Sequence, residues 1–141
     1  MNKLTVDRNN INDMVERGIK LHGHAGPYLN LGIKMGLMAL DKLDVNGYFD
    51  LFTEVELNYR TPVSCLVDGL QISTGCTLGK GNIKVKNNPD TISGFFKSGS
   101  RSLLITLKPE ITDMIDFKKE SCEDLGKQIL DMPDTKLFYY E

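Results

Sequence analysis

The stretch PYLNLGIKMGLMAL, residues 27–40, decides the architecture expected for this chain of 141 residues. Its apolar side chains recur at helical spacing, and Pro27 suits the first turn of a helix, where its missing N–H costs no hydrogen bond. Gly32 and Gly36 stand four positions apart, so one face of the expected helix is bare. Because glycine inside a helix costs about 1 kcal/mol relative to alanine, the pair indicates close approach by another backbone.

Helices and strands are expected on both sides of this segment. Asn10 is a suitable N-cap for a first helix that ends near Lys20. Strand patterns cover residues 51–58, 83–86, 91–97, 102–107 and 137–140, the third and fourth forming a hairpin. Further helices are expected over 63–73, 109–117 and 122–132. Helices first, then mixed strands and helices, predict an α+β or mixed α/β fold in one domain, residues 1–141.

Composition excludes several classes of protein. The chain is 40% hydrophobic and 26% charged. Its net charge is −2, so it lacks the excess of basic residues expected in a protein that binds nucleic acid or an anionic membrane. The N-terminus has no signal-peptide core, and the longest apolar-rich stretch, residues 28–40, is too short and too polar to span a bilayer. We therefore expect a cytoplasmic protein. Its three cysteines would then be free thiols, metal ligands or nucleophiles.

The two histidines stand together in His22-Gly23-His24. Imidazole is the commonest metal ligand. In an extended segment, side chains at i and i+2 point the same way, so both rings could reach one ion. The glycines allow unusual torsions or a close approach to a ligand. The alternative is a loop after a helix with incidental histidines.

Cys65-Leu66-Val67-Asp68 is a second candidate segment. On a helix, Cys65 and Asp68 share a face at i, i+3. A thiol at a helix N-terminus has a lowered pKa, which favours metal binding or nucleophilic attack. The alternative is a small buried thiol with a structural role.

The third candidate, TGCTLGKGN at residues 74–82, superficially resembles a phosphate-binding loop. A Walker motif has four residues between its first glycine and the Gly-Lys pair, followed by Ser or Thr. Here three residues intervene and Gly81 follows Lys80, so we reject a Walker-type nucleotide site. What remains is a loop that offers backbone donors, the Cys76 thiol and the Lys80 amine to an anion or substrate. The alternative is a tight connection in which the glycines only supply positive φ.

Cys122 has no cysteine or histidine near it in the sequence and is expected to be structural. No Cys-x-x-Cys pair occurs, which excludes a zinc ribbon or a thioredoxin-type redox pair.

Together the three segments resemble the FmdE-like family, which takes its name from formylmethanofuran dehydrogenase. Its members carry His-Gly-His-x-Cys-Pro, then Cys-x-x-Asp, then Thr-Gly-Cys-Thr-x-Gly-Lys-Gly-Asn. The counterparts here are residues 22–27, 65–68 and 74–82, and the resemblance covers about residues 10 to 110. One position departs: the family cysteine before Pro27 is Gly26 here, and glycine cannot ligate a metal through a side chain.

The resemblance implies a mixed β-sheet flanked by helices, described for the family as a thioredoxin-like α+β core and usually found as a homodimer. Family genes often accompany those of molybdenum or tungsten formylmethanofuran dehydrogenase, an enzyme of methanogenesis. Zinc can occupy a site built from the histidine and cysteine motifs in some members. Others add a C-terminal zinc finger, whose cysteines this chain lacks, so it resembles the core-only members.

The resulting hypothesis is a zinc-binding accessory or catalytic protein of this C1 metabolism, with a small-molecule substrate or a molybdenum or tungsten enzyme as partner. Its expected metal ligands come from His22, His24, Cys65 and Cys76. The residues expected to act in catalysis are Cys65, Asp68 and Lys80. The residues expected to bind substrate are Thr74, Gly75, Thr77 and Lys80. Two alternatives stay open: a metal-free enzyme with a cysteine nucleophile, and a small-ligand binding module with a degenerate site.

Overall fold

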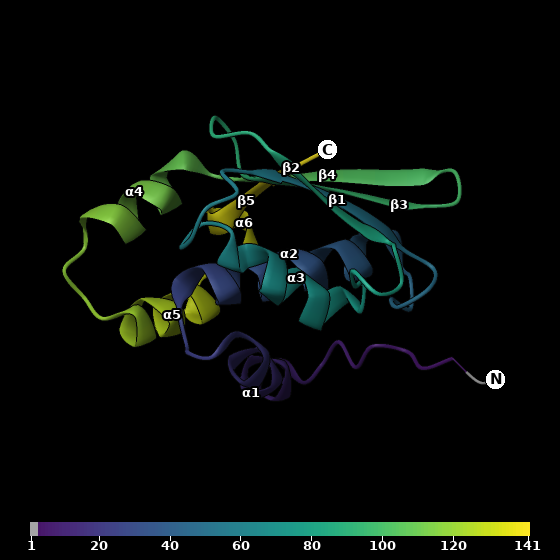
Figure 1. Ribbon diagram of the computed structural model, residues 1–141, viewed down its shortest axis with the longest axis horizontal. Helices are drawn as coiled ribbons and strands as arrows, with labels where there is room; N and C mark the ends of the chain where they lie inside the picture. The colour runs from purple at the N-terminus through teal and green to yellow at the C-terminus, as the bar shows by residue number, and fades with distance from the viewer. Residues whose placement is uncertain (1–2) are drawn as a thin grey trace.

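Helix α2, Pro27–Leu43, lies at the centre of the fold because it is apolar nearly all the way round. The computed structural model describes residues 3–141 and places α2 beside α3, Cys65–Thr74, beneath one face of a β-sheet (Figure 1). Helix α1, Ile11–His22, packs on the side of this pair that faces away from the sheet. The protein is thus an α+β domain with a sheet, a central helix pair and an outer helix.

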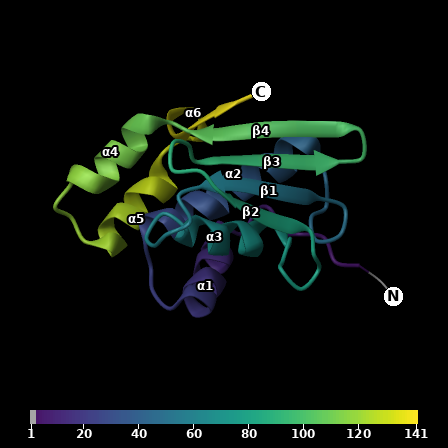
Figure 2. The same cartoon turned by 45° about the horizontal axis from the view of Figure 1, so that its top comes forward.

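The sheet is mixed and has the strand order β2-β1-β3-β4-β5 (Figure 2). The strands are β1 Phe52–Leu57, β2 Ile83–Asn87, β3 Ser93–Ser98, β4 Arg101–Leu107 and β5 Phe138–Tyr140. Strands β1 and β2 are parallel and are connected through α3, whereas every other neighbouring pair is antiparallel. In β1 the side chains of Thr53, Val55 and Leu57 are buried and alternate with half-buried ones, as expected for a strand with one face in the core.

Helices α2 and α3 approach each other through glycine. A Cβ added to Gly32 would overlap the carbonyl oxygen of Leu66 and lie 3.0 Å from the Cα of Gly69. One turn further on, Gly36 faces Ser73, whose hydroxyl donates to the carbonyl of Gly32 at 3.3 Å. Both pairs are separated by 37 positions in sequence, so the helices run parallel and begin at the same end of the molecule. The close backbone approach inferred from the glycine pair is confirmed.

Helix α5, Cys122–Asp131, lies along α2 and is held there by two buried polar side chains of α2. Asn30 Nδ2 donates to the carbonyl of Gly126 at 3.0 Å, and Lys34 Nζ donates to the carbonyls of Ile129 and Leu130, each at 3.3 Å. Contacts further along α2 are made to residues further along α5, since Gly126 precedes Ile129 and Leu130. Helix α5 is therefore also parallel to α2, and α2, α3 and α5 all begin at one end of the molecule.

The elements expected from the sequence are present with small shifts at their ends. Asn10 caps α1 by accepting from the backbone N–H of Asp13 at 3.2 Å, and α4 covers Pro109–Phe117. A single turn, α6 at Asp134–Leu137, was not expected because four residues are too few to show a helical period. Within residues 3–141, none of the helices has the length and apolar character needed to cross a membrane.

We predict that Gly69→Ala and Gly32→Ala each lower the free energy of unfolding by about 3 kcal/mol or more, since the added methyl group must push two backbones apart. Urea denaturation measures the change. Gly79→Ala is the matched control, because its added Cβ would meet no atom closer than 4.0 Å. A loss below about 0.5 kcal/mol in both core variants would contradict the tight helix contact.

Candidate functional site

A pocket of about 320 Å³ opens at the end of the molecule where α2, α3 and α5 begin. Figure 1 shows α4 and α5 at this end, beside the start of α2. The residues of chemical interest in its wall are His22, His24, Tyr28, Cys65, Asp116 and Cys122. Segments far apart in sequence therefore supply one site.

His22, the last residue of α1, is fixed by Asp68 on the first turn of α3. Its Nδ1 lies 2.7 Å from Asp68 Oδ2, and Asp68 Oδ1 is 3.5 Å from the amide nitrogen of Gln71. Because a carboxylate only accepts, Nδ1 donates this hydrogen bond, and in the neutral form of the ring the lone pair is then on Nε2. Nε2 of His22 is buried and has no hydrogen-bond partner among residues 3–141. A buried acceptor of this kind fits a ligand that takes up its lone pair.

His24 presents its ring beside that of His22. Gly23, with φ +106°, ends α1 in the left-handed region and turns the chain, and the two ring centroids are 4.7 Å apart. His24 Nδ1 lies 2.8 Å from the carbonyl oxygen of Ala25, so it too is the protonated nitrogen. Both imidazoles consequently offer Nε2 as an unprotonated donor atom for a metal.

Cys65 is the first residue of α3 and half-buried in the same pocket wall. Burial raises the pKa of its thiol, and the carboxylate of Asp68 raises it further. The lowered pKa expected from the helix N-terminus is therefore wrong, because these two effects outweigh a backbone hydrogen bond that lowers the pKa of the thiol. The free thiol is neutral near pH 7 and is a poor nucleophile in the absence of a cation.

Tyr28 closes the pocket from α2. The residue is 2% exposed, and its hydroxyl has no hydrogen-bond partner in the part of the chain that the structure describes. Burial and the nearby carboxylate of Asp116 raise the pKa of Tyr28 to about 12, so the phenol stays neutral. It is a second buried polar group in this wall without a partner.

The structure does not bring Cys76 to the histidines. Cys65 begins α3 and Cys76 follows its end, and a ten-residue helix separates its ends by about 15 Å. Cys76 is fully buried in the core, where its sulfur lies 3.5 Å from the hydroxyl of Thr53 and 3.4 Å from the carbonyl of Leu51. Cys76 and Cys65 thus belong to opposite ends of one helix.

The other residues of the third motif lie at the Cys76 end. Thr74 donates to the carbonyl of Leu70 at 2.6 Å, and Gly75 ends α3 with φ +74°. The ammonium group of Lys80 is 3.0 Å from the hydroxyl of Thr77 and within 6 Å of two aromatic ring centres, those of Tyr48 and Phe49. These contacts shape the loop itself, and the substrate-binding role of these residues, like the catalytic role of Lys80, stays a prediction.

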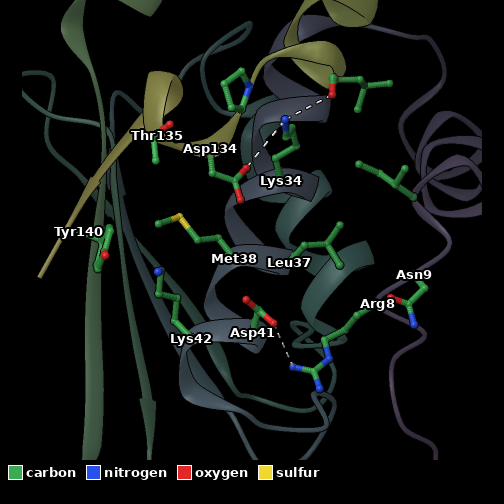
Figure 3. Close-up of a pocket in the computed structure, with 13 residues that line it drawn as sticks. Arg8, Asn9, Lys34, Leu37, Met38, Asp41, Lys42, Asp134, Thr135 and Tyr140 are labelled. Atoms are coloured by element: carbon green, nitrogen blue, oxygen red, sulfur yellow. Dashed lines mark hydrogen bonds and ion pairs between the residues drawn. The ribbon is translucent and has the colours of Figure 1, made fainter.

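A larger hollow, of about 760 Å³, lies between α2 and the C-terminal segment (Figure 3). Its charged groups are already partnered: Arg8 pairs with Asp41 and Asp44, and Lys34 pairs with Asp134 at 3.8 Å. Lys42 lies over the ring of Tyr140, 4.1 Å from its centre. These contacts hold the chain ends against α2, so we place the candidate chemistry in the smaller pocket, where polar atoms lack partners.

We predict that iodoacetamide modifies native, metal-free protein at pH 7.5 in the order Cys122, Cys65, Cys76. Cys122 is exposed, Cys65 is half-buried with a raised thiol pKa, and Cys76 is buried with a raised thiol pKa. Peptide mass spectrometry over time measures the three rates. Fastest reaction at Cys65 would restore the hypothesis of a metal-free cysteine nucleophile.

The comparisons with known proteins agree with the motifs in the pocket. A protein of Archaeoglobus fulgidus named "Probable S-adenosyl-L-methionine-binding protein" is 37% identical over 73 residues, which cover 48% of this chain and 19% of that protein. Because the alignment spans so little of the relative, its name describes the relative alone. The family model described as "FmdE, Molybdenum formylmethanofuran dehydrogenase operon" matches residues 21–139, nearly the whole chain, and the protein therefore belongs to the FmdE family.

Proposed function

We propose that this FmdE-family protein binds a divalent metal ion, zinc above others, through His22, His24 and Cys65. The site would serve an accessory or catalytic role in C1 metabolism of the formylmethanofuran dehydrogenase type. The observation that carries the proposal is a pair of imidazoles whose Nδ1 atoms are both engaged, together with the buried Nε2 of His22, which has no hydrogen-bond partner among residues 3–141. A neutral imidazole with its other nitrogen bonded to a carboxylate or carbonyl is the usual form of a histidine metal ligand.

The donor set favours zinc. Two imidazole nitrogens and a thiolate are ligands that zinc accepts readily, whereas calcium and magnesium prefer oxygen. A cation beside Cys65 would also offset the burial and the Asp68 charge that keep its thiol protonated. When bound, zinc supplies Lewis acidity to a substrate oxygen. Asp68 would orient His22 and increase its basicity.

The donors must move to meet around one ion. Among residues 3–141, no three His, Cys, Asp or Glu side chains are already grouped closely enough to hold a metal ion. His24 is exposed, and its ring nitrogen contacts only the carbonyl of the next residue, so its side chain can rotate toward Nε2 of His22 at little cost. Binding would therefore draw the His24 ring inward.

The metal-free nucleophile is the weaker alternative. It requires a thiol hydrogen-bonded to a base and a lowered thiol pKa. No hydrogen bond joins Cys65 to either imidazole in the described chain, and the pKa of its thiol is raised. The other alternative is a small-ligand binding module with a degenerate site. It predicts that a small ligand raises the melting temperature of the protein without any metal present.

We predict that anaerobically purified protein, stripped with chelator, takes up about one equivalent of zinc, the capacity of one tetrahedral site. His22→Ala and Cys65→Ser should reduce uptake to less than about a tenth of an equivalent, because each removes one of three donors. Elemental analysis after gel filtration measures the content. Cys76→Ser is the matched control and should bind as the parent does, since it makes the same substitution at the other end of α3. Wild-type protein that stays free of zinc would exclude the proposal.

Replacement of the orienting carboxylate gives a graded test. We expect Asp68→Asn to weaken zinc affinity about 10- to 100-fold, because a neutral amide is a poorer acceptor for His22 Nδ1–H. Competition with a chromophoric chelator measures the affinity. Asp90→Asn, in an exposed turn, changes the charge equally and should leave the affinity unaltered. Equal affinities in all three proteins would show that Asp68 does not act on the metal.

A further inference from the structure

We propose that the pocket binds a small, uncharged molecule with an amide group, held by Tyr28 from α2 and Asp116 from α4. The inference rests on the proposed function in treating this molecule as the substrate of the site, whereas its contacts come from residues other than the proposed metal ligands. Both residues line the pocket of about 320 Å³. Pockets for small molecules have volumes of roughly 300–1,000 Å³, so the occupant of this one is small.

The hydroxyl of Tyr28 is a donor that the fold leaves unused. The residue is 2% exposed, and its hydroxyl forms no hydrogen bond within residues 3–141. Burial and then Asp116 raise the pKa of the phenol, and a weaker effect of Thr112, also on α4, lowers it. Thr112 is thus nearby, but the two hydroxyls are not in hydrogen-bonding geometry. A ligand that accepts from Tyr28 would remove the cost of a buried donor without a partner.

The buried side-chain atoms that lack a partner gather at this end of the molecule. Within residues 3–141 they are Nε2 of His22, the hydroxyl of Tyr28 and Oδ1 of Asn30. All three belong to the end of α1 or the first turn of α2, and His22 and Tyr28 line the pocket. Because native proteins leave few such atoms, their grouping around one cavity points to an occupant that pairs with some of them.

Asp116 supplies an acceptor in the same wall. The other charged groups of the segment before α5 are engaged with one another, since Lys118 donates to Gln128 at 3.0 Å and lies 3.9 Å from Glu120. Within the described part of the chain, Asp116 takes no part in this network. Its carboxylate is close enough to Tyr28 to raise the pKa of the phenol, so the two groups can contact one ligand.

Together the two groups match an amide. The O–H of Tyr28 can donate to an amide carbonyl oxygen, and the carboxylate of Asp116 can accept from the amide N–H. A carboxylate ligand offers only acceptors and would be repelled by Asp116. An amidinium ligand offers only donors, so the buried O–H of Tyr28 would stay unpaired.

The rest of the wall favours an uncharged molecule. Its apolar part comes from several separate segments of the chain, namely Pro27, Leu29, Pro62, Ile115 and Leu125. Moving a charged group from water into such surroundings costs more free energy than moving an uncharged one. A hydrocarbon ring or chain beside the amide would contact these side chains.

Three probes of nearly the same size and shape test the amide. Added to the metal-free full chain, benzamide should bind at least about tenfold more tightly than benzoate, which has no N–H, or benzamidine, which has no acceptor. An NMR titration of the labelled protein measures the dissociation constants. Benzamide that binds no more tightly than either analogue, or that does not bind up to its solubility limit, would overturn the inference.

Tyr28→Phe keeps the ring and removes the hydroxyl. It should weaken benzamide binding about five- to tenfold and leave the melting temperature of the free protein unchanged or higher, because the lost group has no partner. Tyr48→Phe is the matched control and should bind benzamide as the parent does. Tyr48 lies at the other end of α3, where its N–H donates to the carbonyl of Thr74 at 2.8 Å. Undiminished affinity in Tyr28→Phe, whatever its melting temperature, would exclude the proposed contact.

Asp116→Ala tests the acceptor by charge as well as by affinity. It should weaken benzamide binding and strengthen benzoate binding, because both the acceptor and the repulsion are removed. Asp113→Ala, an exposed carboxylate on the same helix that does not line this pocket, should change neither. Identical affinities in the two variants would exclude Asp116 from the site.

Zinc uptake separates failure of this inference from failure of the metal proposal. Tyr28→Phe should take up zinc as the wild type does, since Tyr28 is not one of the proposed donors. Zinc uptake without Tyr28-dependent binding of benzamide would overturn the amide site and leave the metal site standing. Tyr28-dependent binding of benzamide by a protein that takes up no zinc would overturn the metal site and support the amide site.

Discussion

The contact between Gly32 and Gly69 is the constraint on which the rest of the structure depends. With no side chain on either residue, the backbones of α2 and α3 meet directly, and the Leu66 carbonyl occupies the space that any larger residue at position 32 would need. Since both helices are apolar on their other faces, they also form the layer that covers the sheet. One contact therefore sets the register that places Cys65 and Asp68 level with the loop after α1.

The parallel arrangement of three helices gives the pocket its character. Each helix begins here, so the positive ends of three helix dipoles lie at the pocket. The thiol of Cys65 nevertheless stays protonated, because burial and the Asp68 carboxylate dominate locally. The pocket thus contains a protonated thiol close to the carboxylate of Asp68, and a cation bound there would release the thiol proton.

The sequence was a good guide to local structure, and two of its motifs do meet in the fold. Periodicity and caps located α1, α2, β1 and the β3–β4 hairpin, and the bare glycine face correctly indicated close backbone packing. The pairing of His22 with Asp68 joins two of the motifs singled out as functional. Sequence spacing could not show that Cys65 and Cys76 lie at opposite ends of α3. The helix between them is about 15 Å long, although the two cysteines are close in sequence.

The position of α5 could not be foreseen either. It depends in part on Lys34, a lysine within the apolar sequence of α2 that would be expected to be exposed to solvent. Lys34 reaches through the core and donates to the carbonyls of Ile129, Leu130 and Met132, where α5 ends without a left-handed cap. Burial lowers the pKa of its ammonium group, so alkaline solution would neutralise it earlier than an ordinary lysine. One wall of the pocket is thereby anchored from behind by a single charge, and loss of that charge would loosen the wall from its far end without any change to the residues that face the cavity.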